Sequence, residues 1–212
     1  MPPDFAGHYH GWRITRINKI IQIFGEEYFD NKTLLELGCG FGDIGLYFEG
    51  LGSDVLFADG RGQHLAKIKE RHRDKTINIV CIDQDRRWNL KRRFDVILHM
   101  GVLYHLQHWR RDLKCALDHS DLIILESEVA NSSNPRFSLK RSEFGYDQAL
   151  HKVACRVSAS NIEKELTNLG ASFERYDDED LNSGLHIYDW KVNRKLPIWE
   201  PARFRRFWIV KK

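Results

Sequence analysis

Residues 34–42 read Leu-Leu-Glu-Leu-Gly-Cys-Gly-Phe-Gly, and this glycine-rich segment decides the fold that the sequence predicts. Its apolar half is typical of a buried strand, which ends at Gly38. Glycines after a strand let the backbone turn tightly and approach a ligand closely. The helix that we expect from Gly42 to Leu51 would present unpaired backbone N–H groups to that ligand. The segment therefore predicts a strand, a ligand-binding turn and a helix.

The same alternation continues along the chain and predicts a three-layer α/β domain with a mostly parallel sheet. Short apolar runs typical of strands lie at residues 54–58, 77–82, 94–99, 121–126, 171–176 and 206–210. Helical periodicity lies at residues 10–24, 62–72, 108–117 and 159–169. Residues 1–30 are expected to form an N-terminal helical cap. Residues 131–158 fit the alternation poorly, and we expect an inserted loop or lid there.

Composition favours one cytoplasmic domain over residues 1–212. The chain is 42% hydrophobic, and 33 Lys and Arg against 30 Asp and Glu leave a formal charge of +3. No apolar run approaches the length of a membrane-spanning helix, and Met1–Asp4 lacks the start of a secretory signal, so we expect no membrane partner. Four scattered cysteines, at 39, 81, 115 and 155, are expected to be reduced core residues.

Acidic residues mark the ends of three predicted strands: Glu36, Asp59 and Asp83. Residues 40–45 also spell G-x-G-x-x-G, and Asp59 follows 19 residues after Gly40, which keeps an NAD-binding oxidoreductase as an alternative. Against it, two further residues separate the strand from Gly40. The Glu36 carboxylate would also repel a pyrophosphate and suit a cationic cofactor.

Residues 36–42 resemble the first motif of class I S-adenosylmethionine (SAM)-dependent methyltransferases, and the likeness covers at least residues 33–126. The resemblance implies a Rossmann-like fold, with a mostly parallel seven-stranded sheet and one antiparallel strand. It implies SAM as cofactor, with Asp59 on the ribose hydroxyls and Asp83 on the adenine amine. The predicted cofactor-binding residues are Glu36, Gly38, Cys39, Gly40, Gly42, Asp59, Gly60, Arg61, Asp83, Gln84, Met100 and Gly101.

Residues 94–105, 125–129, 158–170 and 201–209 more closely resemble a subgroup that includes the tRNA wobble-uridine carboxymethyltransferase. In that family a lysine, the tyrosine of a V-L-Y-H motif and a C-terminal arginine hold the extra carboxylate of carboxy-S-adenosylmethionine. The matching positions here are Arg13, Tyr104, and Arg205 or Arg206. Because arginine replaces the lysine, ordinary methyl transfer from SAM is our first expectation and carboxymethyl transfer the alternative.

Little acid–base chemistry is required, because the sulfonium already activates the methyl group and the enzyme mainly aligns donor and acceptor. A base is needed only when the acceptor must lose a proton. We predict His105, Tyr104 and Arg13 as catalytic residues, with His99 also near the methyl group. The alternative for His105 is a packed structural histidine. The spacing of His99, His105 and His108 fits no common metal motif, so we predict no metal.

The acceptor is expected to be a small molecule or glycan-like metabolite, bound by polar and aromatic side chains. These are Tyr146, Asp147, Gln148, His186, Tyr188 and Trp190. RNA is the alternative partner, because five cations lie at residues 86–93 and eight at residues 191–212. Aromatic residues interleave with them at Trp88, Trp199, Phe204, Phe207 and Trp208. A non-catalytic SAM-binding module is the remaining possibility.

Overall fold

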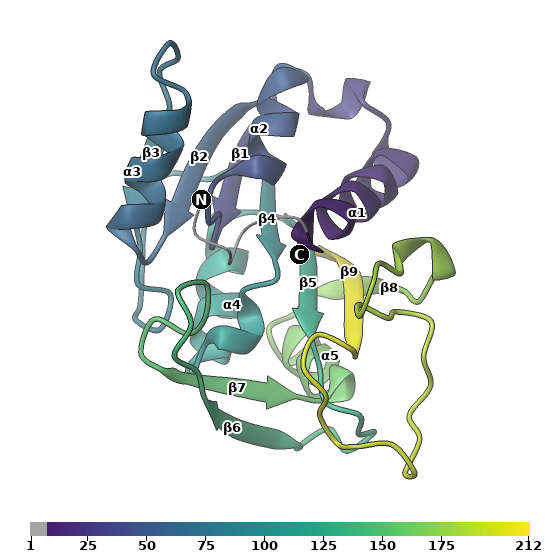
Figure 1. Ribbon diagram of the computed structural model, residues 1–212. Helices are drawn as coiled ribbons and strands as arrows, with labels where there is room; N and C mark the ends of the chain where they lie inside the picture. The colour runs from purple at the N-terminus through teal and green to yellow at the C-terminus, as the bar shows by residue number, and fades with distance from the viewer. Residues whose placement is uncertain (1–7) are drawn as a thin grey trace.

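A seven-stranded sheet forms the centre of the computed structural model, which describes residues 8–212 (Figure 1). Its strands are β1 (Thr33–Leu37), β2 (Asp54–Asp59), β3 (Asn78–Cys81), β4 (Val96–Met100), β5 (Leu122–Glu128), β8 (Ser172–Tyr176) and β9 (Arg205–Lys211). They lie in the order β3-β2-β1-β4-β5-β9-β8. Neighbours from β3 to β5 pair in parallel, whereas β9 is antiparallel to both β5 and β8. The predicted sheet with one antiparallel strand is confirmed.

Helices cover both faces of this sheet, each over its own apolar core. One face carries α1 (His8–Phe24), α2 (Asp43–Gly50) and α3 (Gly62–Arg71), and the other carries α4 (Trp109–His119) and α5 (Ala159–Asn168). Three short 3₁₀ turns are η2 (Glu27–Phe29), η3 (Leu103–His105) and η4 (Glu179–Leu181). The predicted strands and helices of the three-layer domain are all present, with ends displaced by at most two residues.

The parallel register brings the loops after β1, β2, β3 and β4 to one edge of the sheet. Leu37 lies opposite both Ala58 and His99, and Asp59 lies opposite Cys81. From β1 the chain adds β2 and β3 on one side of the sheet and then returns to add β4 and β5 on the other side. The direction of strand addition therefore reverses between β1 and β4. Such a switch point opens a crevice outside the carboxyl ends of the strands, where α/β proteins bind their ligands.

The expected loop at residues 131–158 contains a hairpin of β6 (Ser138–Ser142) and β7 (Val153–Val157). β7 is largely buried because its apolar side chains pack against η3, which explains why this stretch is a strand. In Figure 1 the hairpin lies across the bottom of the view, at the end of the sheet towards which β4 and β5 point.

At the N-terminus, the predicted cap over residues 1–30 corresponds to α1 and η2, although residues 1–7 lie outside the described part. α1 packs Ile17 and Ile20 onto the sheet. Within residues 8–212, no helix is both long and apolar enough to cross a membrane.

All four cysteines are free thiols, and three of them are buried as expected. Cys81 is the exception. It is exposed because β3 is the edge strand of the sheet, so a side chain there lacks a neighbouring strand on one side.

Candidate functional site

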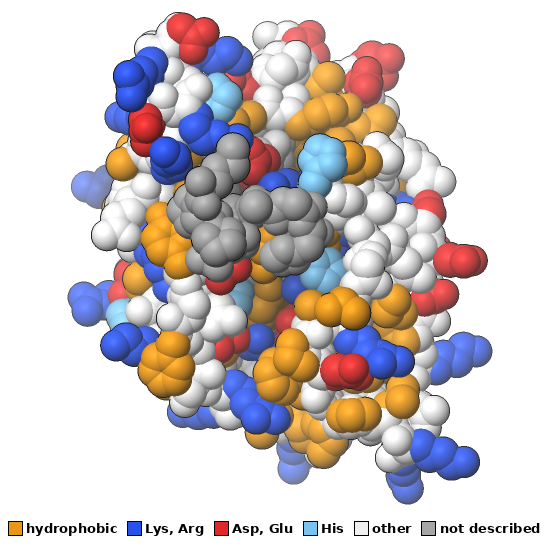
Figure 2. All heavy atoms as spheres, in the orientation of Figure 1, with side chains coloured by type: hydrophobic (Ala, Val, Ile, Leu, Met, Phe, Trp, Pro, Cys, Tyr) orange, Lys and Arg blue, Asp and Glu red, His pale blue; other side chains and the backbone are white. Residues whose placement is uncertain are grey.

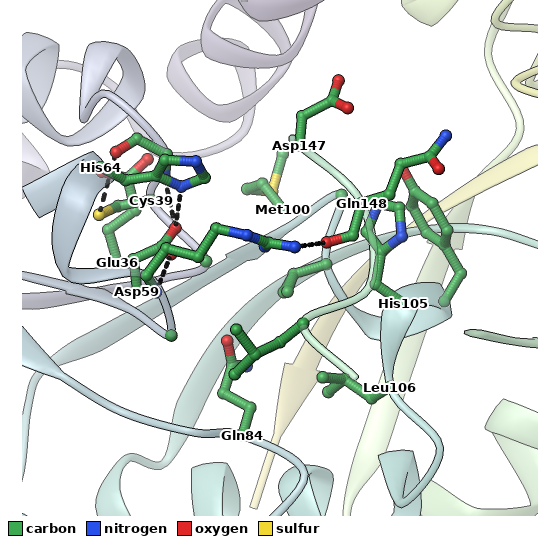
Figure 3. A pocket seen from close by; sticks show the side chains of 18 of the residues that line it. Glu36, Cys39, Asp59, His64, Gln84, Met100, His105, Leu106, Asp147 and Gln148 are labelled. Carbon is green, nitrogen blue, oxygen red and sulfur yellow. Dashed lines mark hydrogen bonds and ion pairs between the residues drawn. The ribbon is translucent and has the colours of Figure 1, made fainter. Parts of the chain in front are cut away.

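A pocket lies at the carboxyl edge of the sheet, between the loops after β1 to β4, the N-terminal part of α1 and the insertion at 131–158. Every predicted cofactor-binding and catalytic residue except Gly42 lines it. Figure 3 shows Glu36 and Asp59 at one end of the pocket, His105 at the other, and Met100 between them.

Gly42 supports the pocket from behind and does not line it, contrary to our prediction. It adopts φ 75° at the start of α2, where a Cβ would lie 3.1 Å from the Phe57 ring in the core. Gly38 does face the pocket. With φ 63°, its Cβ would lie 2.6 Å from Val102 Cγ2, so a side chain there would force the β1 and β4 loops apart.

Asp59 ties two pocket loops together. Its Oδ2 accepts a hydrogen bond from the Gly40 N–H at 3.0 Å, and its Oδ1 accepts one from the Arg61 N–H at 2.7 Å. The Nδ1 atom of His64 lies 3.2 Å from Oδ2. The carboxylate is thus fixed at the pocket wall, with lone pairs left for a ligand's hydroxyl groups.

Glu36 lies deeper, on β1, with its Oε2 accepting from the Gly45 N–H at 3.1 Å. Burial is the main reason that its pKa is raised to about 8. Without a bound cation, the Glu36 carboxyl is therefore mostly protonated at neutral pH, and a positive ligand group would favour its ionised form.

We expect Glu36→Gln to flatten the pH dependence of stability. Because folding raises this pKa, the protonated carboxyl stabilises the fold, and wild-type protein loses that stability as pH rises from about 4.5 towards 8. The glutamine cannot ionise, so the free energy of unfolding of the variant should fall by up to a few kcal/mol less than that of the wild type over this pH interval. Urea unfolding at pH 5 and pH 8.5 measures the difference. If the free energy of unfolding changed equally with pH in both proteins, the raised pKa of Glu36 would be contradicted.

Asp83 lies at the pocket wall after β3. It accepts from His151 Nε2 at 3.0 Å and pairs with Arg86 Nε at 3.0 Å. Since His151 belongs to the insertion, Asp83 joins the insertion to the sheet edge. The adjacent Gln84 turns its amide towards Asp112.

His99 does not lie beside the pocket as predicted. Side chains alternate along a strand, so Met100 faces the pocket and His99 faces α4. There the His99 ring pairs with the buried Asp112 carboxylate at 2.6 Å. Asp112 also accepts from the Trp88 indole at 2.8 Å, so this histidine belongs to a structural network.

Buried charges surround the other end of the pocket. Arg205 pairs with Glu126 at 3.0 Å and with Glu128 at 3.7 Å, and it donates to the Tyr104 hydroxyl at 3.1 Å. Burial raises the pKa of Tyr104 to about 12, so its hydroxyl stays protonated. Of the two candidate C-terminal arginines, only Arg205 lines the pocket, because Arg206 points to the other face of β9.

Arg13 reaches the pocket from α1. Its guanidinium pairs with Asp43 at 3.1 Å, and Asp43 also pairs with Arg71 at 3.1 Å. Both Arg13 and Asp43 line the pocket. The positive charge predicted at this position is therefore already balanced by a neighbouring carboxylate.

His105 contacts a residue that the sequence did not single out. Its Nδ1 lies 2.5 Å from Oε2 of Glu143, which immediately follows β6. Arg156 on β7 holds the other Glu143 oxygen at 2.5 Å. No sequence spacing indicates these contacts, because they join segments 38 and 13 residues apart.

Of the six side chains predicted to bind the acceptor, only Asp147 and Gln148 line the pocket. Tyr188 is fully buried and donates to Glu126 at 2.6 Å, and Trp190 packs on the Phe204 ring. The other two are His186, packed against Trp12, and Tyr146, packed against His64. α1 also contributes Tyr9 and Trp12, which belong to the segment 8–16 that we expected to close over the acceptor.

Four of the five aromatic residues that interleave with the basic clusters do not reach the surface, whereas Trp199 is half-buried. Trp88, Phe204, Phe207 and Trp208 are buried in the core, where they cannot stack on bases. Three of the five cations at 86–93 are in ion pairs. Figure 2 shows Lys and Arg side chains spread over the visible face, with acidic side chains among them.

Within residues 8–212, no group of three or more His, Cys, Asp or Glu side chains is arranged to hold a metal ion. A protein-family model described as a methyltransferase domain matches residues 9–174. The chain belongs to this methyltransferase family. The match covers the whole parallel part of the sheet, the pocket loops and the insertion.

Solved structures resemble this methyltransferase in fold. The N-terminal domain of EvdMO1, crystallised in the presence of SAH and D-fucose, is 17% identical with a TM-score of 0.70, covering 98% of this chain and 84% of that one. A DhpI-SAM-HEP complex is 14% identical with a TM-score of 0.63, covering 98% and 89%. Magnesium protoporphyrin IX methyltransferase (ChlM) from Synechocystis PCC 6803 with bound SAM is 13% identical with a TM-score of 0.62, covering 95% and 80%. No curated protein sequence matches the chain.

Proposed function

We propose that this methyltransferase takes its methyl group from SAM and transfers it to a small-molecule acceptor. The observation that carries the proposal is the set of three carboxylates, Glu36, Asp59 and Asp83, around one pocket at the switch point of the sheet. SAM supplies an activated methyl group on a positively charged sulfur. Everything else is done by the side chains that bind and align the two reactants.

The donor groups of the pocket fit SAM. Asp59 would accept from the ribose hydroxyls and Asp83 from the adenine amine. The deep carboxyl of Glu36 favours the positive charges of the amino acid part. Ile82 and Leu106 provide apolar walls suited to a base. The Asp59 and Asp83 carboxylates at this pocket would repel the pyrophosphate of NAD, which makes the dinucleotide alternative unfavourable.

The arginines at the pocket favour SAM over its carboxylated derivative. An extra carboxylate needs a free cation, but Arg13 already pairs with Asp43 and Arg205 with Glu126. The fully buried Glu126 would also repel a second carboxylate brought to Arg205.

The N-terminal part of α1 and the insertion at 131–158 would act as a cap and lid that exclude water. Two contacts support this role. Arg61 donates to the Gln148 carbonyl at 2.6 Å, and the Tyr9 hydroxyl donates to Asp147 at 3.1 Å. The second contact joins α1 to the insertion directly, so both segments close over the same pocket.

A pocket bordered by α1 and the insertion suits a small acceptor better than a polymer. Proteins of similar fold support this class, because one was crystallised in the presence of D-fucose and another is named for a porphyrin. Burial of Trp88, Phe204, Phe207 and Trp208 leaves few aromatic side chains on which RNA bases could stack, which favours the small-molecule acceptor over RNA.

Isothermal titration calorimetry with SAM, SAH, carboxy-SAM and NAD tests the cofactor assignment. We expect SAM and SAH to bind, carboxy-SAM to bind at least ~10-fold more weakly, and NAD not to bind. Repulsion between like charges is the reason for both differences: Glu126 repels the extra carboxylate of carboxy-SAM, and Asp59 and Asp83 repel the pyrophosphate of NAD. Binding of NAD in preference to SAM would overturn the assignment.

A further inference from the structure

The contact between His105 and Glu143 defines the state of the imidazole. Nδ1 of His105 faces the carboxylate at 2.5 Å, and among residues 8–212 the other ring nitrogen, Nε2, makes no hydrogen bond. A carboxylate can only accept, so Nδ1 carries a proton, and in the neutral imidazole Nε2 is then the nitrogen with a free lone pair. His105 lines the pocket, with 15% of its side chain exposed.

Glu143 is held in its ionised form. Burial opposes the charge, but the hydrogen bonds from His105 and Arg156 outweigh it and lower the pKa of Glu143 to about 2. Its Oε2 also accepts from the Ala149 N–H at 3.0 Å. Three donors therefore fix the carboxylate that orients His105.

This arrangement continues into the core as a chain of alternating charges. Arg156 pairs with Glu143 and with Glu128, both at 2.5 Å, and Glu128 lies 3.7 Å from Arg205. The arginine and glutamate side chains of this ion-pair network are almost completely buried, whereas His105 is partly open to the pocket. A buried network thus positions one imidazole at the pocket wall.

We propose that His105 is the catalytic base, that Glu143 positions it, and that the acceptor is therefore a hydroxyl compound. The inference rests on the proposed function. In the reaction, His105 Nε2 takes the hydroxyl proton as the acceptor oxygen forms its bond to the methyl carbon. The bond between that carbon and sulfur breaks, and its electron pair stays on sulfur. The products are a methyl ether, SAH and an imidazolium paired with Glu143.

A hydroxyl acceptor needs such a base, because an alcohol is a poor nucleophile until its proton leaves. A neutral amine or a thiolate attacks without one. The charged group that contacts His105 is Glu143 after β6, while Arg156 on β7 contacts Glu143 and Tyr104, and Arg205 on β9 contacts Tyr104. Both arginines are already paired with glutamates and have no lone pair to accept a proton, whereas Nε2 of the neutral imidazole does.

The tautomer of His105 tests the proposal directly. We expect ¹⁵N NMR of the free protein at pH 8 to show His105 with a protonated Nδ1 and an unprotonated Nε2. The signal is assigned by its loss in His105→Asn. Glu143→Ala should lose the Nδ1–H preference, and Glu143→Leu, which also lacks an acceptor but fills more of the space, serves if the alanine variant does not fold. A wild-type His105 protonated on Nε2 would overturn the proposal.

The variant His105→Asn removes the proposed base but keeps the hydrogen bond to Glu143. Its amide N–H still donates to that carboxylate, but no atom lies at the Nε2 position. It should bind SAM with wild-type affinity. With tritiated SAM and D-fucose, other monosaccharides and phenols as probes, transfer to oxygen should fall at least ~100-fold. Wild-type rates in the variant, or product methylated on nitrogen or sulfur from matched amine and thiol probes, would overturn the proposal.

If the wild-type protein gives no product with these probes, the tautomer of His105 alone decides. A wild-type protein that fails to bind SAM would refute the proposed function instead, independently of the tautomer.

Discussion

Asp59→Ala is expected to weaken SAM binding by at least ~100-fold while the protein stays folded. The change removes the carboxylate that would accept from the ribose hydroxyls. It also removes the acceptor for two backbone N–H groups, those of Gly40 and Arg61, which donate to the Asp59 carboxylate at 3.0 and 2.7 Å and so tie the two pocket loops together. Charge-assisted hydrogen bonds contribute about 1.5–3 kcal/mol each, so losing two accounts for an effect of this size. Isothermal titration calorimetry with SAM measures it.

Two variants control this experiment. Asp59→Asn keeps one acceptor oxygen and should give an intermediate dissociation constant. Asp54 lies at the opposite end of the same strand, exposed and bonded to Asn78 at 3.3 Å, so Asp54→Ala should bind SAM like the wild type. Unchanged affinity in Asp59→Ala would remove this residue from the ribose role.

Arg156→Ala is expected to destabilise the protein by about 3–5 kcal/mol. Arg156 is 3% exposed, pairs with Glu128 and Glu143 at 2.5 Å, and donates to the Tyr104 carbonyl at 2.7 Å. Without the guanidinium, two buried carboxylates lose their main counter-charge, and desolvation is no longer offset. Urea unfolding at pH 7 measures the loss in the free energy of unfolding.

The matched control is Arg203→Ala, because Arg203 pairs with Glu200 at the surface with 43% of its side chain exposed. An exposed pair of this kind contributes about 0–1 kcal/mol. Lowering the pH should also reduce the difference in the free energy of unfolding between the wild type and Arg156→Ala. His105 and Arg156 together lower the pKa of Glu143 to about 2, and Arg156 and Arg205 lower that of Glu128. The stabilisation from Arg156 is therefore present above the unfolded pKa values of these carboxyls and is lost as pH falls. A loss in Arg156→Ala no larger than in Arg203→Ala would show that the buried network contributes little.

Much of the pocket end that we propose for the cofactor could be predicted from sequence, because each part of it is local. A strand, a glycine turn and a helix follow one another within residues 33–50, and Asp59 and Asp83 each come at or just after the end of their own strand. In a parallel sheet all carboxyl ends meet at one edge, so these positions must converge whatever the rest of the chain does. Gly42 is the exception, since the turn directs it to the core.

The acceptor end could not be predicted in this way, because long-range contacts make it. His99 and His105 look alike in sequence, yet strand alternation directs His99 to Asp112 and leaves His105 at the pocket. Tyr188 and Trp190 resembled pocket residues by type, but Tyr188 satisfies its hydroxyl in the core, on Glu126. Residue type alone does not indicate which side of an element faces a cavity.

By itself, the sequence of this methyltransferase determined the three-layer fold, the edge of the sheet that holds the pocket, and the acids at that edge. Hydrophobic periodicity and strand polarity are properties of short segments, so they can be read without knowing what packs against them. Tertiary structure alone decided which arginines remain available and which histidine is oriented. It placed Arg205 against Glu126 by pairing β9 with β5, and Glu143 against His105 by folding the insertion back over η3. Buried charges must find partners, and those partners come from segments far apart in the chain.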